Sequence, residues 1–107
     1  MTKRTLLLSL VLACASATAL AAGDPEAGFK KSTPCQACHG PKGISVSPEF
    51  PNLAGQTQDY LVAALRHYKN GKRANPIMRG QAANLTERDI EDLTAYFSSQ
   101  HGLYVKN

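Results

Sequence analysis

Two cysteines three positions apart, followed directly by a histidine, are the residues of this chain best suited to do chemistry. They stand as Cys35, Cys38 and His39 in the stretch Cys-Gln-Ala-Cys-His. This order and spacing is the attachment signature of a c-type haem, in which each thiol can form a thioether to the porphyrin edge. The imidazole that follows can then bind the iron through a ring nitrogen. The sequence therefore predicts one covalently bound haem c, attached at Cys35 and Cys38 and ligated by His39.

Three other uses of the same residues are open. A thioredoxin-like redox pair needs a strand before the motif, and no alternating or β-branched run precedes Cys35. A structural zinc site needs four ligands, and the chain shows no second paired spacing of cysteines or histidines. A disulfide would explain both cysteines but would give His39 no role. Haem attachment is the interpretation that uses all three residues.

The iron's second axial position needs its own candidate, and Met78 is the first choice. It lies between Pro76 and Gly80, in a stretch that we expect to be a loop, and a loop can bring a thioether to a metal. A His/Met ligand pair raises the haem potential. His67, near the end of a predicted helix, is the rival ligand, and we expect His101 at the surface.

The elements that must position these residues are helical. Asp24 and Pro25 predict a helix start, and that helix should end near Lys31 or Ser32 because Pro34 disfavours helical geometry at Thr33. Residues 57–71 form the clearest helix, with Thr57 as cap and Gly71 as left-handed stop. Its apolar stripe should face the core and consists of Tyr60, Leu61, Ala64, Leu65 and Tyr68.

The remaining segments predict two connections and a final helix. Residues 40–56 are rich in Gly and Pro and form a loop, which we expect Ile44, Val46, Phe50 and Leu53 to anchor. Residues 72–85 should also be irregular. Thr86 and Asp89 resemble a capping box that opens a helix ending near Ser99. With no strand pattern or repeat in residues 23–107, the chain is predicted to be all-α and a single domain.

The first 22 residues predict export. A basic start, a short apolar run and small residues around Ala21 and Ala22 are typical of a signal peptide, which leaves a domain at residues 23–107. An alternative is a lipid anchor at Cys14, within a loose lipobox.

The basic charge of the chain belongs partly to this segment. The formal net charge of the whole chain is +4, and removal of Lys3 and Arg4 lowers it by two. Nucleic-acid binding therefore gains no support. Residues 23–107 make a small domain with a marginal core, and a haem would add both an apolar slab and a cross-link.

Taken with its other motifs, the chain resembles the class I c-type cytochromes, specifically the small monohaem cytochrome c-553 group and the single-haem halves of the c4 group. The resemblance covers the whole predicted domain. Beyond the haem motif it is carried by the stretches Pro51–Gln56, Tyr68–Arg73, Pro76–Gly80 and Leu85-Thr86.

The resemblance implies three main helices around the haem, with the N- and C-terminal helices crossing. Gly28 and Phe29 would then lie against Leu93, Tyr96 and Phe97. From the residues alone, we expect Phe29 to be an ordinary core residue. It also implies that the carbonyl of Pro51 accepts a hydrogen bond from His39, and that Leu53 packs on the haem.

The function implied by the resemblance is single-electron transfer in the periplasm, without catalysis. Membrane cytochrome complexes, terminal oxidases and periplasmic dehydrogenases are the expected redox partners, and the released domain is expected to be monomeric and not inserted in the membrane. We expect a mildly basic docking face formed by Lys42, Lys69, Lys72, Arg73 and Arg79. A haem module that binds or senses a small gas, or a cytochrome subunit of a larger dehydrogenase, are the alternatives.

Overall fold

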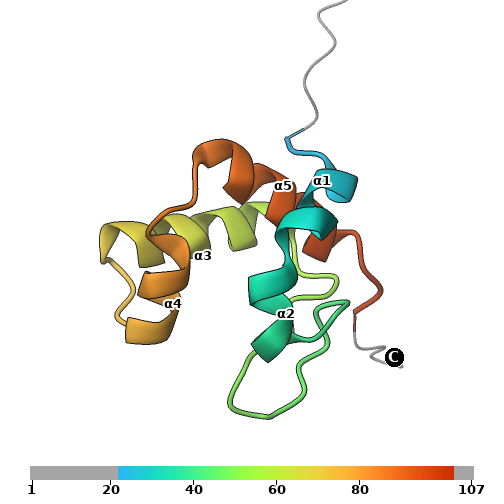
Figure 1. Ribbon diagram of the computed structural model, residues 1–107, viewed down its shortest axis with the longest axis horizontal. Coiled ribbons are helices and arrows are strands. Elements are labelled where there is room, and N and C mark those ends of the chain that lie inside the picture. Colours follow the sequence, from blue (N-terminus) through green and yellow to red (C-terminus); the bar gives the residue numbers. More distant parts are fainter. Residues whose placement is uncertain (1–21, 103–107) are drawn as a thin grey trace, which may run out of the picture.

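The computed structural model describes residues 22–102, which form five helices and no strand (Figure 1). The helices are α1 (Pro25–Lys31), α2 (Thr33–His39), α3 (Gln58–Asn70), α4 (Pro76–Ala82) and α5 (Glu87–Ser98). The predicted all-α class is confirmed, and α2 and α4 are short additions to the three predicted helices. No helix within residues 22–102 has the length and apolar character needed to cross a bilayer. The predicted signal peptide and Cys14 lie outside the described residues, except for Ala22.

The N-terminal helix α1 packs directly on the C-terminal helix α5 (Figure 1). Gly28 allows this close approach, because a Cβ added to it would lie 1.9 Å from the carbonyl oxygen of Asp92. The ring of Phe29 lies 5.4 Å from the ring of Tyr96, centroid to centroid. Phe29 is nevertheless 53% exposed, so its expected place in the core is wrong. The Phe29 ring packs on the buried ring of Tyr96 and keeps its other side in solvent, because no further element within residues 22–102 covers α1 there.

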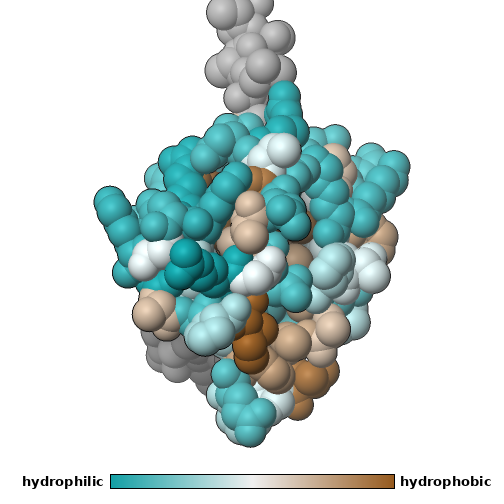
Figure 2. Space-filling view, turned by 60° about the vertical axis from the view of Figure 1, so that its left-hand side comes forward, coloured by the Kyte–Doolittle hydropathy of each residue, from teal (hydrophilic) through white to brown (hydrophobic). Residues whose placement is uncertain are grey.

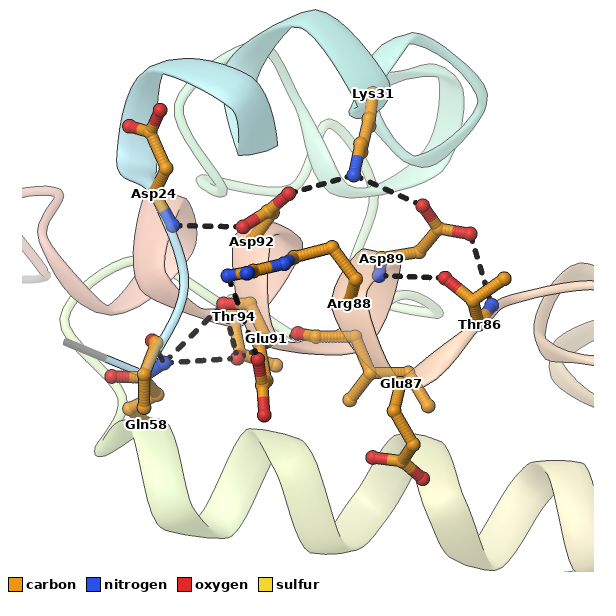
Figure 3. Close-up of polar contacts among 12 residues, drawn as sticks. Asp24, Lys31, Gln58, Thr86, Glu87, Arg88, Asp89, Glu91, Asp92 and Thr94 are labelled. Carbon is orange, nitrogen blue, oxygen red and sulfur yellow. Dashed lines mark hydrogen bonds and ion pairs between the residues drawn. The ribbon is translucent and has the colours of Figure 1, made fainter. Parts of the chain in front are cut away.

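A group of polar side chains, here called the α1–α5 clamp, fixes the same crossing (Figure 3). It consists of Asp24, Lys31, Asp89 and Asp92. The buried carboxylate of Asp92 accepts hydrogen bonds from the backbone N–H of Asp24 at 2.8 Å and from Lys31 Nζ at 2.7 Å. Lys31 also lies 3.0 Å from Asp89. Burial acts to raise the pKa of the Asp92 carboxyl, but the bonds from Lys31 and Asp24 outweigh it and the pKa is lowered.

The predicted helix ends are mostly present. At the start of α5, Asp89 N–H donates to Thr86 Oγ1 at 3.1 Å, and Thr86 N–H donates to Asp89 Oδ2 at 2.9 Å, so the capping box is confirmed. Gly71 ends α3 in the left-handed conformation, with φ at +83°. Thr57 occupies the N-cap position of α3, but its side chain makes no cap hydrogen bond.

Helix α3 packs on both α5 and α4 and completes the frame of the molecule (Figure 1). Leu61 from α3 meets Tyr96 and Phe97 from α5 in the buried core. At the surface, Arg66 of α3 pairs with Glu87 of α5 at 2.8 Å. Tyr60 is 51% exposed, so the predicted stripe is buried at Leu61 but opens to solvent at one edge.

Candidate cofactor site

A cavity of about 530 Å³ opens between α2, α3, α4 and the loop that joins α2 to α3. Its volume is within the range of about 300–1,000 Å³ that is typical of small-molecule and cofactor sites. Both cysteines of the motif, His39 and Met78 line it. Its walls are mainly apolar and include Leu53, Leu61, Ala64, Leu65, Leu85, Leu93 and Phe97.

Helix α2 presents the predicted attachment motif to this cavity. Pro34 ends the preceding helix, as the sequence predicts, but it also occupies the first turn of α2, where its missing N–H costs nothing. Residues three apart in a helix share a face, so Cys35 and Cys38 are brought to the same side of α2. Both cysteines are free thiols, so the disulfide alternative is wrong for this structure. Burial raises the pKa of the Cys35 thiol, so the reactive thiolate of a redox pair is disfavoured.

His39 is held in one orientation at the end of α2. It is 6% exposed, and its Nδ1 lies 2.8 Å from the carbonyl oxygen of Pro51. A carbonyl oxygen can only accept, so Nδ1 carries the proton and the Nε2 lone pair stays available. The ring of Phe50 contacts the imidazole edge-on, with the centroids 6.4 Å apart. This is the arrangement in which an outer hydrogen bond fixes the orientation of a metal-binding histidine.

The loop between α2 and α3 is held by its own backbone. The carbonyl of Gly43 accepts from the N–H groups of Leu53 and Ala54, at 2.7 and 3.1 Å. The N–H of Ser45 donates to the side chain of Asn52 at 2.7 Å. These bonds hold the part of the loop that carries Pro51 and Leu53 in place at the wall of the cavity.

Two of the four apolar side chains that we expected to anchor this loop are exposed to solvent instead. Phe50 and Leu53 are half-buried and line the cavity, whereas Ile44 is 39% exposed and Val46 is 72% exposed. The loop is fixed by hydrogen bonds instead of these two side chains. The sequence did not reveal this, because a Gly- and Pro-rich segment has no period that separates inner from outer positions.

Met78 lies in a helix, so its predicted loop setting is wrong. Pro76 occupies the first turn of α4, and the side chain of Asn75 accepts a hydrogen bond from Met78 N–H at 3.0 Å. This cap and the proline start a helix within the segment predicted to be irregular. Met78 nevertheless lines the cavity, as does its neighbour Ile77, whereas His67 and His101 do not.

The donor set of the cavity fits a haem and does not fit zinc. Within residues 22–102, no three His, Cys, Asp or Glu side chains are grouped as a metal ion would require. Two thiols, one oriented imidazole and one thioether stand instead around an apolar space. Soft sulfur and imidazole ligands suit iron held in a porphyrin, and the porphyrin itself would fill the apolar volume.

Comparison with known proteins agrees with this site. The family model described as cytochrome c matches residues 26–101. The chain therefore belongs to the cytochrome c family. Within it, the chain is a class I c-type cytochrome of c4-like type. Its prosthetic group is a covalently bound haem c.

Three relatives define this placement. Cytochrome c4 of Pseudomonas aeruginosa is 46% identical over 96 residues, which cover 89% of this chain and 48% of that protein. Cytochrome c-554(548) of Halomonas halodenitrificans is 42% identical over 82 residues, which cover 74% of this chain and 99% of that protein. A thiosulfate dehydrogenase electron acceptor of Stutzerimonas stutzeri is 37% identical over 68 residues, covering 61% of this chain and 32% of that protein.

A solved structure gives the same result. The crystal structure of reduced cytochrome c4 from Pseudomonas stutzeri has a TM-score of 0.72 and 44% sequence identity, over 76% of this chain and 47% of that one. The chain thus spans about half the length of the c4 relatives that it matches. The predicted family and fold class are confirmed.

Several groups near the site were not assigned to it from the sequence. Tyr68, Arg73, Asn75 and Gln81 line the cavity beside the apolar wall. Arg73 was grouped with the surface cations, since a sequence gives no sign of which cation turns toward a pocket. Asn75 directly before Pro76 is a helix-start signal, and it could have revealed α4.

Proposed function

We propose that the haem is attached at Cys35 and Cys38 and that His39 and Met78 are the axial ligands of its iron. The observation that carries the proposal is that one and the same mainly apolar cavity is lined by the thiols and imidazole of α2 and by the thioether of α4. When bound, the haem supplies a metal that cycles between the ferrous and ferric states. The chain holds His39 through Pro51 and Met78 through the cap of α4, and the apolar walls exclude water.

With both axial positions filled, the protein would be an electron carrier without a substrate at the metal. Figure 2 shows the side of the molecule on which α3 and α4 lie. Hydrophobic residues gather in the lower half of this view, and the upper half is mostly hydrophilic. Tyr60 and Ile77, which are 51% and 62% exposed, lie at the cavity and offer apolar contact to a partner. A small apolar area surrounded by charge suits brief electron-transfer encounters.

The test is an absorption spectrum of the purified protein in both oxidation states, followed by a redox titration of Met78→Ala. We expect the spectrum of a covalently bound haem with a weak far-red band from sulfur on ferric iron. The Met78→Ala midpoint should fall by on the order of tenths of a volt, because axial ligands tune haem potentials over about 0.8 V. His67→Ala is the control and should keep the parent midpoint. A colourless protein, or a fall with His67→Ala in place of Met78→Ala, would contradict the assignment.

The remaining parts of the function concern location and partners. We propose that residues 1–22 are a signal peptide and that the domain at 23–107 works as a monomer in the periplasm. It would exchange electrons with membrane cytochrome complexes, terminal oxidases or periplasmic dehydrogenases. The intact mass of the exported protein tests this, since cleavage near Ala21 or Ala22 and acylation of Cys14 give different masses.

A second candidate role is that of a cytochrome subunit in a dehydrogenase. The similarity to a thiosulfate dehydrogenase electron acceptor favours it. If the chain is such a subunit, dehydrogenase activity should co-elute with it on gel filtration from its native host. A gas-binding role has its own test, because reduced protein should then change its spectrum with carbon monoxide, whereas a firmly held Met78 would prevent the change.

A further inference from the structure

Arg73 stands at the cavity with its side chain held over an aromatic ring. Its guanidinium carbon lies 4.8 Å from the ring centroid of Tyr68, and Nη1 donates to the hydroxyl of Tyr60 at 3.5 Å. All three residues line the cavity. Stacking on a tyrosine face favours a cation, and the hydroxyl limits the directions that the guanidinium can take. The backbone is held as well, since Arg73 N–H donates to the carbonyl of His67 at 3.1 Å.

The charges around the cavity single out this arginine. The other strongly basic side chain that lines it, Lys31, is committed to Asp92 at 2.7 Å and Asp89 at 3.0 Å. Within residues 22–102, no carboxylate lies within ion-pair distance of Arg73. Glu49 is the one acidic side chain among the lining residues that the structure describes. Arg73 is therefore a cation oriented at the cavity without an acidic partner among residues 22–102.

A haem c brings two carboxylates of its own, the propionates. Ionised carboxylates resist burial, so they belong at the solvent-facing rim of an apolar cavity. Arg73 is exposed while it lines the cavity, which places it at such a rim. A planar guanidinium also matches a carboxylate through two parallel hydrogen bonds, which a lysine cannot reproduce.

We propose that Arg73 binds a haem propionate and that Tyr68 and Tyr60 position its guanidinium for this contact. The inference rests on the proposed attachment at Cys35 and Cys38. It adds that this cation serves the cofactor, whereas the sequence placed it on a docking face for protein partners.

The proposal has an electrostatic consequence for the iron. A fixed cation lowers the pKa of a neighbouring carboxyl group and disfavours the more positive ferric state. Without Arg73, the midpoint potential should fall and the propionate pKa should rise by about one unit or more. Reduction would then be coupled to protonation, so the midpoint should decrease with rising pH in the range where the propionate titrates. The other titratable groups around the cavity are Lys31, His39, Glu49, Tyr60 and Tyr68, besides the thiols of Cys35 and Cys38, which the proposed attachment converts to thioethers.

The experiment is a redox titration against pH of exported holoprotein carrying Arg73→Gln. The matched control is Lys72→Gln, which removes one positive charge at the adjacent, exposed residue that does not line the cavity. We expect Arg73→Gln to lower the midpoint and to add a pH-dependent fall, while Lys72→Gln follows the parent. The propionate titration, followed by nuclear magnetic resonance, should move only in Arg73→Gln. Equal, pH-independent effects of the two variants would overturn the proposal.

Two further variants keep the test decisive if Arg73→Gln does not fold. Arg73→Lys keeps the charge but not the paired hydrogen bonds, and Tyr60→Phe removes the hydroxyl that orients the guanidinium. Both should raise the propionate pKa by less than a charge loss would, and a parent-like pKa in both overturns the proposal. The haem spectrum separates a failure of the Arg73 proposal from a failure of the proposed haem attachment and ligation. A variant that keeps the spectrum of His/Met-ligated haem but has a parent-like propionate pKa contradicts only the role of Arg73.

Discussion

Gly28 of α1 and Asp92 of α5 pack backbone to backbone, with the carbonyl oxygen of Asp92 occupying the place that a Cβ on Gly28 would need. The same Asp92 holds Lys31 and the N–H of Asp24 through its carboxylate. One position of α5 thus fixes both the distance and the polar contacts of the helix crossing. The crossing sets where α2 begins, because only Ser32 separates α1 from α2.

Gly28→Ala should therefore destabilise the fold strongly. The added methyl would lie 1.9 Å from the Asp92 oxygen and 2.8 Å from the Cβ of Tyr96, so the helices must separate. We expect the free energy of unfolding to fall by about 1–3 kcal/mol, as in other overpacked cores. Denaturant unfolding of the holoprotein measures it. Gly80→Ala in α4 is the control: apart from its chain neighbours and the backbone of its own helix, no protein atom lies within 4 Å of the added Cβ, and stability should rise by about 0.5–1 kcal/mol.

Asp92→Ala should weaken the same crossing by a different route. It leaves the N–H of Asp24 without its acceptor and leaves Lys31 with Asp89 as its remaining partner. Loss of such partners costs about 1–3 kcal/mol of unfolding free energy. Thermal unfolding would measure the change. Removal of the exposed Glu26 carboxylate, which is 3.8 Å from Lys30, provides the comparison and should leave the melting temperature nearly unchanged.

The α1–α5 clamp should also make stability depend on pH at the acid end. Hydrogen bonds lower the pKa of both Asp89 and Asp92 in the fold. Their stabilisation is fully present above the pKa of an unfolded aspartate, about 3.9, and is lost as the pH falls through the lower folded pKa values. Unfolding free energies measured from neutral to strongly acid pH should show this loss. In Asp92→Asn the loss should be smaller, and an unchanged pH profile would exclude Asp92 as its source.

Lys31 should make the stability of the fold depend on pH at the alkaline end. Its bonds to Asp92 and Asp89 raise the pKa of its ammonium. The stabilisation is fully present below the unfolded lysine pKa of about 10.4 and is lost as the pH rises through the folded value. Lys31→Met should remove this alkaline loss, while Lys30→Met on the neighbouring exposed residue should retain it.

Asn75→Ala should make the position of Met78 less fixed while leaving the Met78 side chain itself unchanged. The Asn75 side chain caps α4 through the N–H of Met78, and loss of such a cap costs about 1 kcal/mol of helix stability. If Met78 ligates the iron, the far-red sulfur band should weaken and carbon monoxide should bind the reduced protein more readily. Asn75→Asp should keep the cap and the parent spectrum. An unaltered spectrum in Asn75→Ala would show that α4 does not depend on this cap.

Much of the site could be predicted from local sequence. The order Cys35, Cys38, His39 needs only one helical turn to bring its groups together, so spacing alone indicated the cofactor. The capping box at Thr86 and the stop at Gly71 are equally local and were predicted correctly. Phe29, Ile44 and Val46 were placed in the interior wrongly, because apolar character does not state which face an element presents.

The sequence by itself determined the helical class, the attachment motif and most helix ends, because each depends on neighbours within a few residues. The family resemblance implied that Pro51 meets His39, but only the tertiary structure decided that Asp92 is buried and that Met78 and Arg73 reach one cavity. These relationships join residues far apart in the chain. They follow from how α1, α3 and α5 pack, and no local pattern encodes the packing of distant surfaces.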